Sequence, residues 1–251
     1  MSTFMLLKKA LKQISCILVG RGKHKRFKSS SGTALRGVTT RLANLVFSKG
    51  KFPMAALRSD APAGGHWRGP GGGRRRGIAV DKQVSKLASL TESRRTNSTM
   101  LHLTRHVFAC LDTRGLLPIM GQKATCSENA RIGTAADIVC YHAATRELVV
   151  VELKCGHSGW RKAAARLASG ANCLMRGNAI ALAPDTVLNR HLAQLAVTRH
   201  LLVAEHQTQF KTMNITEVRG LLIYANDSGV DAYNLSQWWI DRAAAILRDI
   251  S

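Results

Sequence analysis

Two runs of mostly apolar residues, joined by a short polar segment, constrain the fold more than any other feature of the chain. The first run is Thr134–Tyr141 and the second, rich in valine, is Glu147–Cys155. The segment between them is short enough for a hairpin connection. A turn centred between Ala144 and Thr145 would place opposite one another the residues whose numbers sum to 289. The sequence therefore predicts two antiparallel strands in a fixed register.

Elements of both helical and strand periodicity surround this hairpin. Helices are expected within 1–20 and at 80–87, 98–113, 160–168, 188–206 and 237–250, and further strands at 116–124, 218–225 and 230–235. Strands that alternate with helices in this order predict a mixed central sheet flanked by helices. The expected fold class is therefore α/β.

Positive charge is concentrated in the first third of the chain. The net charge is +22, and residues 1–80 carry 17 Lys and Arg against a single acid, Asp60. The segment Ala61–Gly77 is rich in Gly and Arg, a composition typical of flexible chain. The expected organisation is a basic, largely disordered arm at 1–77 before a folded domain at 78–251. Such charge favours nucleic acid as a partner through counterion release, although a targeting arm or a ribosome-like tail would have the same composition.

Cysteine usage and the N-terminal segment bear on the compartment. The six cysteines form no CxxC pair, so neither a zinc site nor a disulfide framework is expected, and an intracellular location is favoured. The apolar run Ile14–Val19 is too short to span a membrane. The basic segment Lys23–Lys28 favours a nuclear address, with a mitochondrial or other organellar presequence as the alternative. The sequence contains no signal for an oligomeric state.

Three polar residues of the hairpin carry the candidate chemistry. Asp137 and Glu152 sum to 289, so they would be cross-strand neighbours with Cβ atoms roughly 5 Å apart. Lys154 lies two residues after Glu152 and therefore points to the same face. Two carboxylates this close repel each other unless a cation lies between them, and an all-oxygen ligand set favours Mg²⁺ or Mn²⁺. The alternative is a strand whose polar end simply emerges into solvent.

The pattern Asp137…Glu152-Leu-Lys154, on adjacent strands after a helix and a first strand, resembles the PD-(D/E)xK nuclease superfamily. This resemblance implies a restriction-endonuclease-like sheet and cleavage of nucleic acid with Mg²⁺ or Mn²⁺. It implies metal binding by Asp137, Glu152 and the backbone carbonyl of Leu153. The RecB and lambda-exonuclease branches add a glutamine on a later helix, which matches Gln194 and would steady the attacking water or Lys154. The run is also similar to a nuclease-like family of large DNA viruses.

One departure from the superfamily pattern concerns a further acid. Many members carry an acid on the first core helix, where the helix expected at 98–113 offers only Asp112, near its end. Asp81 or Glu128 could replace it from elsewhere, and the pattern also lacks the proline of the family name. One-ion and two-ion chemistry, and activity itself, therefore stay open.

Basic residues after the second strand are candidates for binding nucleic acid. Arg161, Lys162 and Arg166 follow the strand, and the last two are spaced to grip backbone phosphates from one helix face. An ordinary solvated helix face would look the same. The expectation is a Mg²⁺-dependent nuclease that hydrolyses DNA. The alternatives are a catalytically inactive, nucleic-acid-binding relative and a basic RNA-binding structural or assembly protein.

Overall fold

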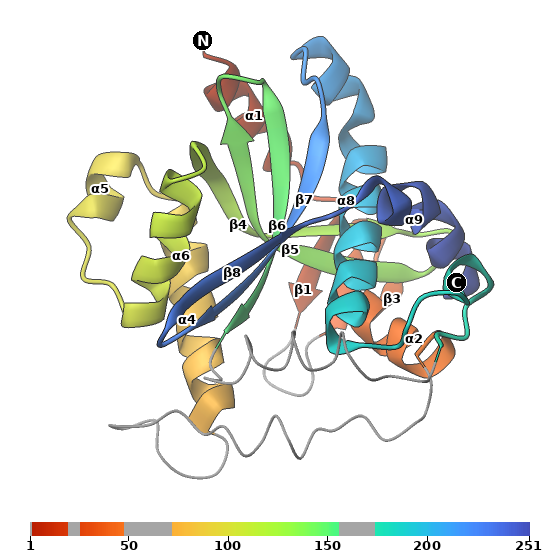
Figure 1. Ribbon diagram of the computed structural model, residues 1–251. Coiled ribbons are helices and arrows are strands. Elements are labelled where there is room, and N and C mark those ends of the chain that lie inside the picture. The colour runs from red at the N-terminus through yellow and green to blue at the C-terminus, as the bar shows by residue number, and fades with distance from the viewer. Residues whose placement is uncertain (1, 20–25, 48–71, 156–173) are drawn as a thin grey trace.

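Eight strands form one mixed sheet in the computed structural model, which describes residues 2–19, 26–47, 72–155 and 174–251 (Figure 1). The strands are β1 (Cys16–Val19), β2 (Arg26–Ser29), β3 (Ala34–Gly37), β4 (Leu116–Ser127), β5 (Ile132–His142), β6 (Glu147–Cys155), β7 (Val218–Asn226) and β8 (Gly229–Asn234). Their order is β1-β2-β3-β5-β6-β7-β8, and β4 pairs with β5 along its other edge. The pairs β3–β5 and β6–β7 are parallel and the others are antiparallel.

The hairpin of β5 and β6 has the register that the sequence predicts. Ile138 pairs with Val151 and His142 pairs with Glu147, so that each pair sums to 289. Strand β6 also has the predicted bounds, Glu147–Cys155. A shift of this register by one residue would move the side chains of one strand from one core to the other and turn Glu152 and Lys154 to the opposite face.

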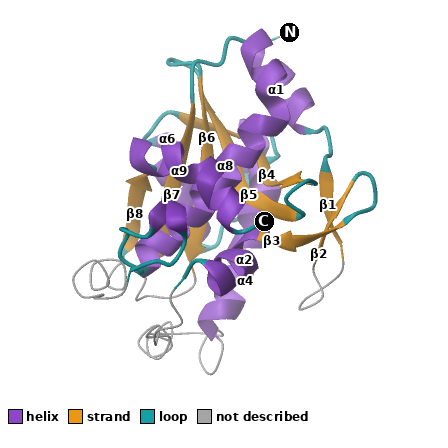
Figure 2. Ribbon diagram, turned by 90° about the vertical axis from the view of Figure 1, so that its right-hand side faces the viewer, coloured by secondary structure: helices purple, strands orange, loops and turns teal. Residues whose placement is uncertain are grey.

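Helices cover both faces of the sheet (Figures 1 and 2). They are α1 (Thr3–Leu11), α2 (Val38–Leu45), α4 (Gly72–Ala88), α5 (Glu92–Thr96), α6 (His102–Asp112), α8 (Val187–Thr212) and α9 (Gln237–Asp249), with a 3₁₀ turn at Asn178–Ile180. Leu148 and Val150 belong to the core shared with α1, α2, α8 and α9. Val149, Val151 and Leu153 belong to the core shared with α4 and α6. Strand β6 is thus buried on both faces from Leu148 to Leu153, and its alternate apolar residues supply the two cores.

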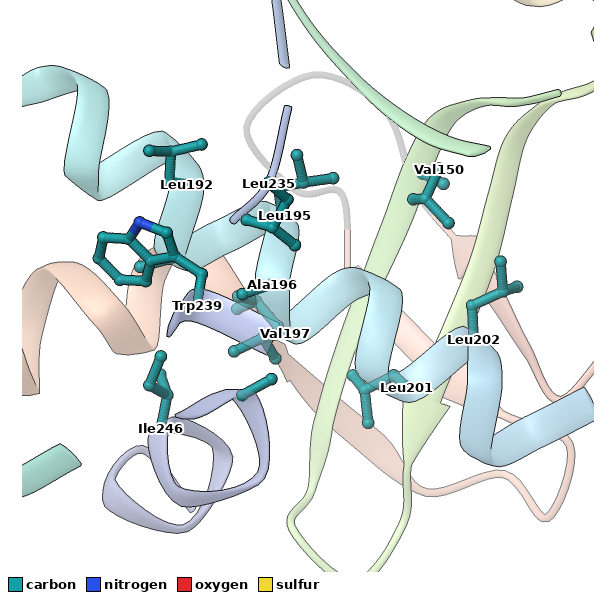
Figure 3. Packing of buried hydrophobic residues seen from close by; sticks show 14 of the residues in the cluster. Val150, Leu192, Leu195, Ala196, Val197, Leu201, Leu202, Leu235, Trp239 and Ile246 are labelled. Atoms are coloured by element: carbon teal, nitrogen blue, oxygen red, sulfur yellow. The ribbon is translucent and has the colours of Figure 1, made fainter. Parts of the chain in front are cut away.

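Helix α8 forms the centre of the larger core (Figure 3). Its residues Leu195, Ala196 and Val197 are fully buried, and Figure 3 shows them between Val150 of β6 and Trp239 of α9. Burial of a leucine side chain contributes about 1.5–3 kcal/mol. This packing fixes α8 across the sheet and so fixes the polar residues that α8 presents to the strands.

The prediction of a largely disordered arm at 1–77 is wrong for the parts that the structure describes. Leu7 and Leu11 of α1, and Val38 and Leu42 of α2, are at most 1% exposed and join the larger core. Strands β1–β3 extend the sheet, with Arg36 paired to Ile132. The predicted boundary at 77 falls inside α4. The average composition of 1–77 hides short apolar patterns. In the structure these segments pack on the larger core and pair beside β5.

Some predictions have no counterpart in the described part of the chain. The helix expected at 160–168 lies outside it. Among the described helices, none has the length and hydropathy needed to cross a lipid bilayer.

Candidate active site

The candidate site lies where β5 and β6 separate. Their pairing ends at Ile138 and Val151, and Asp137 and Glu152 occupy the next position of the same register. Beyond this point β6 continues beside β7, whereas β5 pairs with β3 at Gly133. We call the point where the two strands separate the β5–β6 fork. There, backbone groups of β6 can form hydrogen bonds with side chains instead of with β5.

Asp137 is held by one backbone group and one side chain. Its Oδ2 accepts a hydrogen bond of 2.7 Å from the backbone N–H of Leu153, and its Oδ1 accepts one of 3.0 Å from Nε2 of Gln122. Burial raises the pKa of Asp137, although Lys154 and these two donors act in the opposite direction. Because that N–H comes from the residue after Glu152, Asp137 is anchored directly to the other candidate acid's strand.

Glu152 is 2% exposed and has two side-chain donors on one oxygen. Its Oε1 accepts hydrogen bonds from Nζ of Lys154 and, at 2.7 Å, from Nε2 of Gln194. Burial raises the pKa of Glu152 to about 7, because the lowering effect of Lys154 is partly offset by the negative charges of Asp137 and Asp81. The negative charges of Asp137 and Asp81 therefore act on Glu152. The single positive charge of Lys154 does not neutralise the three carboxylates.

Lys154 remains a cation in this environment. Burial alone would lower its pKa, but Glu152 and Asp137 outweigh that effect and raise it. Its side chain is 19% exposed, compared with 3% for that of Glu152. The ammonium-bearing side chain is thus more exposed than Glu152 and can reach a bound anion.

One face of α8 presents three polar residues to three neighbouring strands. Nδ1 of His191 lies 2.8 Å from the hydroxyl of Tyr224 on β7, Gln194 bonds Glu152 on β6, and Thr198 lies 3.0 Å from Thr134 Oγ1 on β5. From the sequence, Gln194 is expected to steady Lys154 or a water. The structure pairs Gln194 with Glu152, because α8 crosses the sheet over β6 at this point.

A third acid reaches the site from α4. Nε2 of Gln122 lies 3.0 Å from Oδ1 of Asp81 as well as 3.0 Å from Oδ1 of Asp137, so one amide group bridges the two carboxylates. Helix α4 approaches β4 very closely at Gly121, where a Cβ would lie 2.5 Å from the Cα of Ser85. This close contact brings Asp81 within reach of β4.

The other two candidates for the further acid lie elsewhere. Asp112 is exposed near the end of α6, and Glu128 is exposed and accepts a hydrogen bond from Ser31. Asp81 is therefore the one of the three that the structure brings to the site.

Gln122 is the site residue that the sequence analysis missed. It has a φ of +51° and lies between the paired residues Gly121 and Lys123 of β4. A non-glycine residue in this left-handed conformation is uncommon, and no local sequence pattern predicts it. Strand periodicity alone would assign Gln122 to an ordinary position on one face of β4.

Other predicted site residues have less structural support. Arg161, Lys162 and Arg166 lie outside the described residues. Leu153 is buried, and its N–H bonds Asp137, while the role of its carbonyl as a metal ligand stays a prediction.

The carboxylate donors of the site suit a hard divalent cation. Among the described residues, no group of three or more His, Cys, Asp or Glu side chains is arranged to hold a metal ion. However, Glu152 is buried and Asp137 is half-buried, desolvation raises the pKa of both carboxyl groups, and both would gain from a further positive charge. The oxygen donors of these carboxylates suit Mg²⁺ or Mn²⁺.

Comparison with known proteins does not assign the chain to a family. No model of a protein family matches it, and a search of curated proteins gave no match either. A function must therefore be inferred from the residues of the site.

Proposed function

We propose that the protein is a metal-dependent nuclease of the PD-(D/E)xK type that hydrolyses phosphodiester bonds, with DNA as the favoured substrate. One observation carries the proposal: Asp137 and Glu152 occupy the same register position at the β5–β6 fork, directly after the last pair, with Lys154 bonded to Glu152. A strand that merely emerged into solvent would leave Glu152 exposed, but it is 2% exposed and has two side-chain donors.

Asp137 and Glu152 would hold Mg²⁺ or Mn²⁺, together with the carbonyl of Leu153. When bound, such an ion would activate water and stabilise negative charge on the scissile phosphate. Gln194 keeps Glu152 oriented by donating to Oε1. Lys154 would bind a non-bridging phosphate oxygen and stabilise the charge that develops in the transition state, because its ammonium is the cationic group of the site.

The charge of the chain supports a polyanionic substrate. A net charge of +22 favours binding of nucleic acid without sequence preference and makes that binding strongly dependent on salt. A nuclear location is part of the proposal.

A cleavage assay on linear, circular and single-stranded DNA, and on RNA, with Mg²⁺ or Mn²⁺ tests the proposal. Lys154→Ala should lower the rate by on the order of 10² or more, as expected for loss of a group that stabilises transition-state charge. Lys211→Ala is the matched control, because Lys211 is exposed in the last turn of α8. Equal rates for wild type and Lys154→Ala would refute the role of Lys154.

Metal binding separates an active enzyme from an inactive relative. Calorimetry with Mn²⁺ should show binding to the wild type that Asp137→Asn abolishes, with Asp112→Asn as the exposed control. Nucleic acid binding without uptake of Mn²⁺ or cleavage would instead identify a nucleic-acid-binding protein that has lost catalysis.

A further inference from the structure

A pair of histidines on α6 lies apart from the carboxylate site. His102 and His106 are one turn apart, and their Nε2 atoms lie 3.0 Å from each other. The two rings meet edge to face, with centroids 4.4 Å apart and an angle of 83° between their planes. His102 is exposed and His106 is half-buried, so the space beside the two nitrogens is open to solvent.

The separation of the two nitrogens is the one that a chelated transition metal requires. A metal–nitrogen distance of about 2.0–2.1 Å places adjacent nitrogen ligands about 2.9 Å apart at a right angle and about 3.3 Å apart at a tetrahedral angle. The observed 3.0 Å lies between these values. Because the two nitrogens are already close together, little conformational entropy would be lost on binding.

The surroundings of the pair keep it available to a cation. Partial burial, the neighbouring His102 and Arg105 lower the pKa of His106, so its ring is neutral near pH 7 and offers a lone pair. Asp227, in the turn between β7 and β8, contributes negative charge that acts on both histidines. Arg76 fixes this carboxylate with two hydrogen bonds, one of them 2.7 Å long.

We propose that His102 and His106 form a two-histidine chelate for a borderline-soft divalent transition metal such as Ni²⁺, Cu²⁺ or Zn²⁺. The remaining coordination positions would be taken by water or by a group from another molecule, because the described residues contain no third ligand arranged to complete the site. Imidazole nitrogens select these metals, whereas the carboxylates at the β5–β6 fork select Mg²⁺ or Mn²⁺. The protein would thus have two cation sites of different chemical preference.

Titration of the full chain with Ni²⁺ by calorimetry tests the proposal. His102→Gln and His106→Gln should each lower the affinity of one Ni²⁺ equivalent at least tenfold, and the double variant should lose no more than either single variant, because a chelate needs both rings. His142→Gln is the matched control, since its Nδ1 is engaged with Thr145. Cu²⁺ should bind more tightly than Ni²⁺, and Zn²⁺ more weakly than Cu²⁺.

Two results would overturn the proposal. Unchanged Ni²⁺ binding in both single variants would show that the contact is only a hydrogen bond between the rings. Equal losses in His142→Gln and His106→Gln would show unspecific binding to single histidines. Ni²⁺ should also raise the melting temperature of the wild type but not that of the double variant, and thermal melts without metal confirm that each variant is folded.

Discussion

Replacing Glu205 by Gln should destabilise the protein strongly, although this carboxylate lies far from the β5–β6 fork. Glu205 lies in α8, and its Oε1 accepts a 3.0 Å hydrogen bond from Nζ of Lys123 on β4. Its Oε2 accepts hydrogen bonds from Thr125 Oγ1 at 2.6 Å and from Ser15 Oγ at 2.7 Å. Lys123 also donates to the carbonyl of Gln13 at 2.6 Å. The cluster therefore ties the segment before β1 to the sheet and to α8.

The magnitude follows from burial and charge. The side chain of Lys123 is 4% exposed and that of Glu205 is 12% exposed. Loss of one partner leaves the other charge buried without compensation, which typically costs about 3–5 kcal/mol. Lys123 keeps its bond to Gln13, so we expect a loss of about 3 kcal/mol in the free energy of unfolding, at the low end of that range.

The pKa of Glu205 gives an independent value. Burial alone would raise this pKa, but contacts with His206, Thr125, Ser15 and Lys123 outweigh burial and lower it from 4.5 to about 2. A difference of this size corresponds to about 3 kcal/mol, which residual solvent screening reduces to about 2 kcal/mol. Because the folded-state pKa is the lower one, this stability is fully present above pH 4.5 and is lost as the pH falls towards about 2.

Urea denaturation followed by circular dichroism at pH 7 and at lower pH values measures both effects. Glu205→Gln should lose about 3 kcal/mol at pH 7 and show a smaller decline of stability below pH 4.5 than the wild type. Glu217→Gln, at an exposed carboxylate, should change stability by less than about 0.5 kcal/mol. A loss of less than about 1 kcal/mol in Glu205→Gln would contradict the stabilising role of Glu205. So would a variant whose free energy of unfolding decreases below pH 4.5 as steeply as that of the wild type.

Two further substitutions test the support of the candidate site. Gln194→Leu removes a donor to ionised Glu152, so the pKa of Glu152 should rise further and the acid limb of the pH–rate profile should move to higher pH, with about a tenfold loss of rate near pH 7; Gln207→Leu, exposed on the same helix, should leave the profile unchanged. Gly121→Ala places a Cβ 2.5 Å from the Cα of Ser85 and should cost about 1–3 kcal/mol while displacing Asp81 with α4, so a fully stable and active variant would contradict this packing.

The elements that the sequence predicts best are those with strong periodicity. Strand β6 has the predicted bounds, and α9 ends one residue before the predicted position at 250. Helix α8 continues to Thr212, six residues beyond the predicted end, across a kink at His206. The sequence analysis missed β1–β3 and α2 because each is only four to eight residues long and lies in a segment dominated by Gly, Ser, Lys and Arg. Such short strands depend on the edge of β5, which no local pattern reveals.

Some residues of the candidate site can be related from local sequence, whereas others are placed only by tertiary packing. Asp137, Glu152 and Lys154 follow from one hairpin and its alternation, so the sequence alone relates their positions. Asp81 is brought to them by the packing of α4 against β4, and Gln122 by a left-handed backbone conformation. These two contacts depend on tertiary structure, so the sequence could name Asp81 as a possibility but could not place it.

Because the described N-terminal elements are part of the fold, the role of their positive charge in DNA binding should be tested by substitution and not by deletion. Arg26, Lys28 and Arg36 are exposed on β2 and β3, and β3 pairs with β5 at Gly133, four residues before Asp137. Deletion of 1–77 would remove core residues of α1 and α2 together with this charge, so a loss of DNA binding in that deletion would not distinguish charge from stability.

Replacement of Arg26, Lys28 and Arg36 by Gln removes positive charge without changing any core residue. Each lost phosphate contact should reduce the slope of log K against log salt concentration by about 0.9 on double-stranded DNA. A slope that stays unchanged in the triple variant, with an unchanged melting temperature, would mean that nucleic acid does not contact this edge of the sheet. A smaller slope with unchanged melting temperature would place bound nucleic acid along β2 and β3, which join the sheet beside β5.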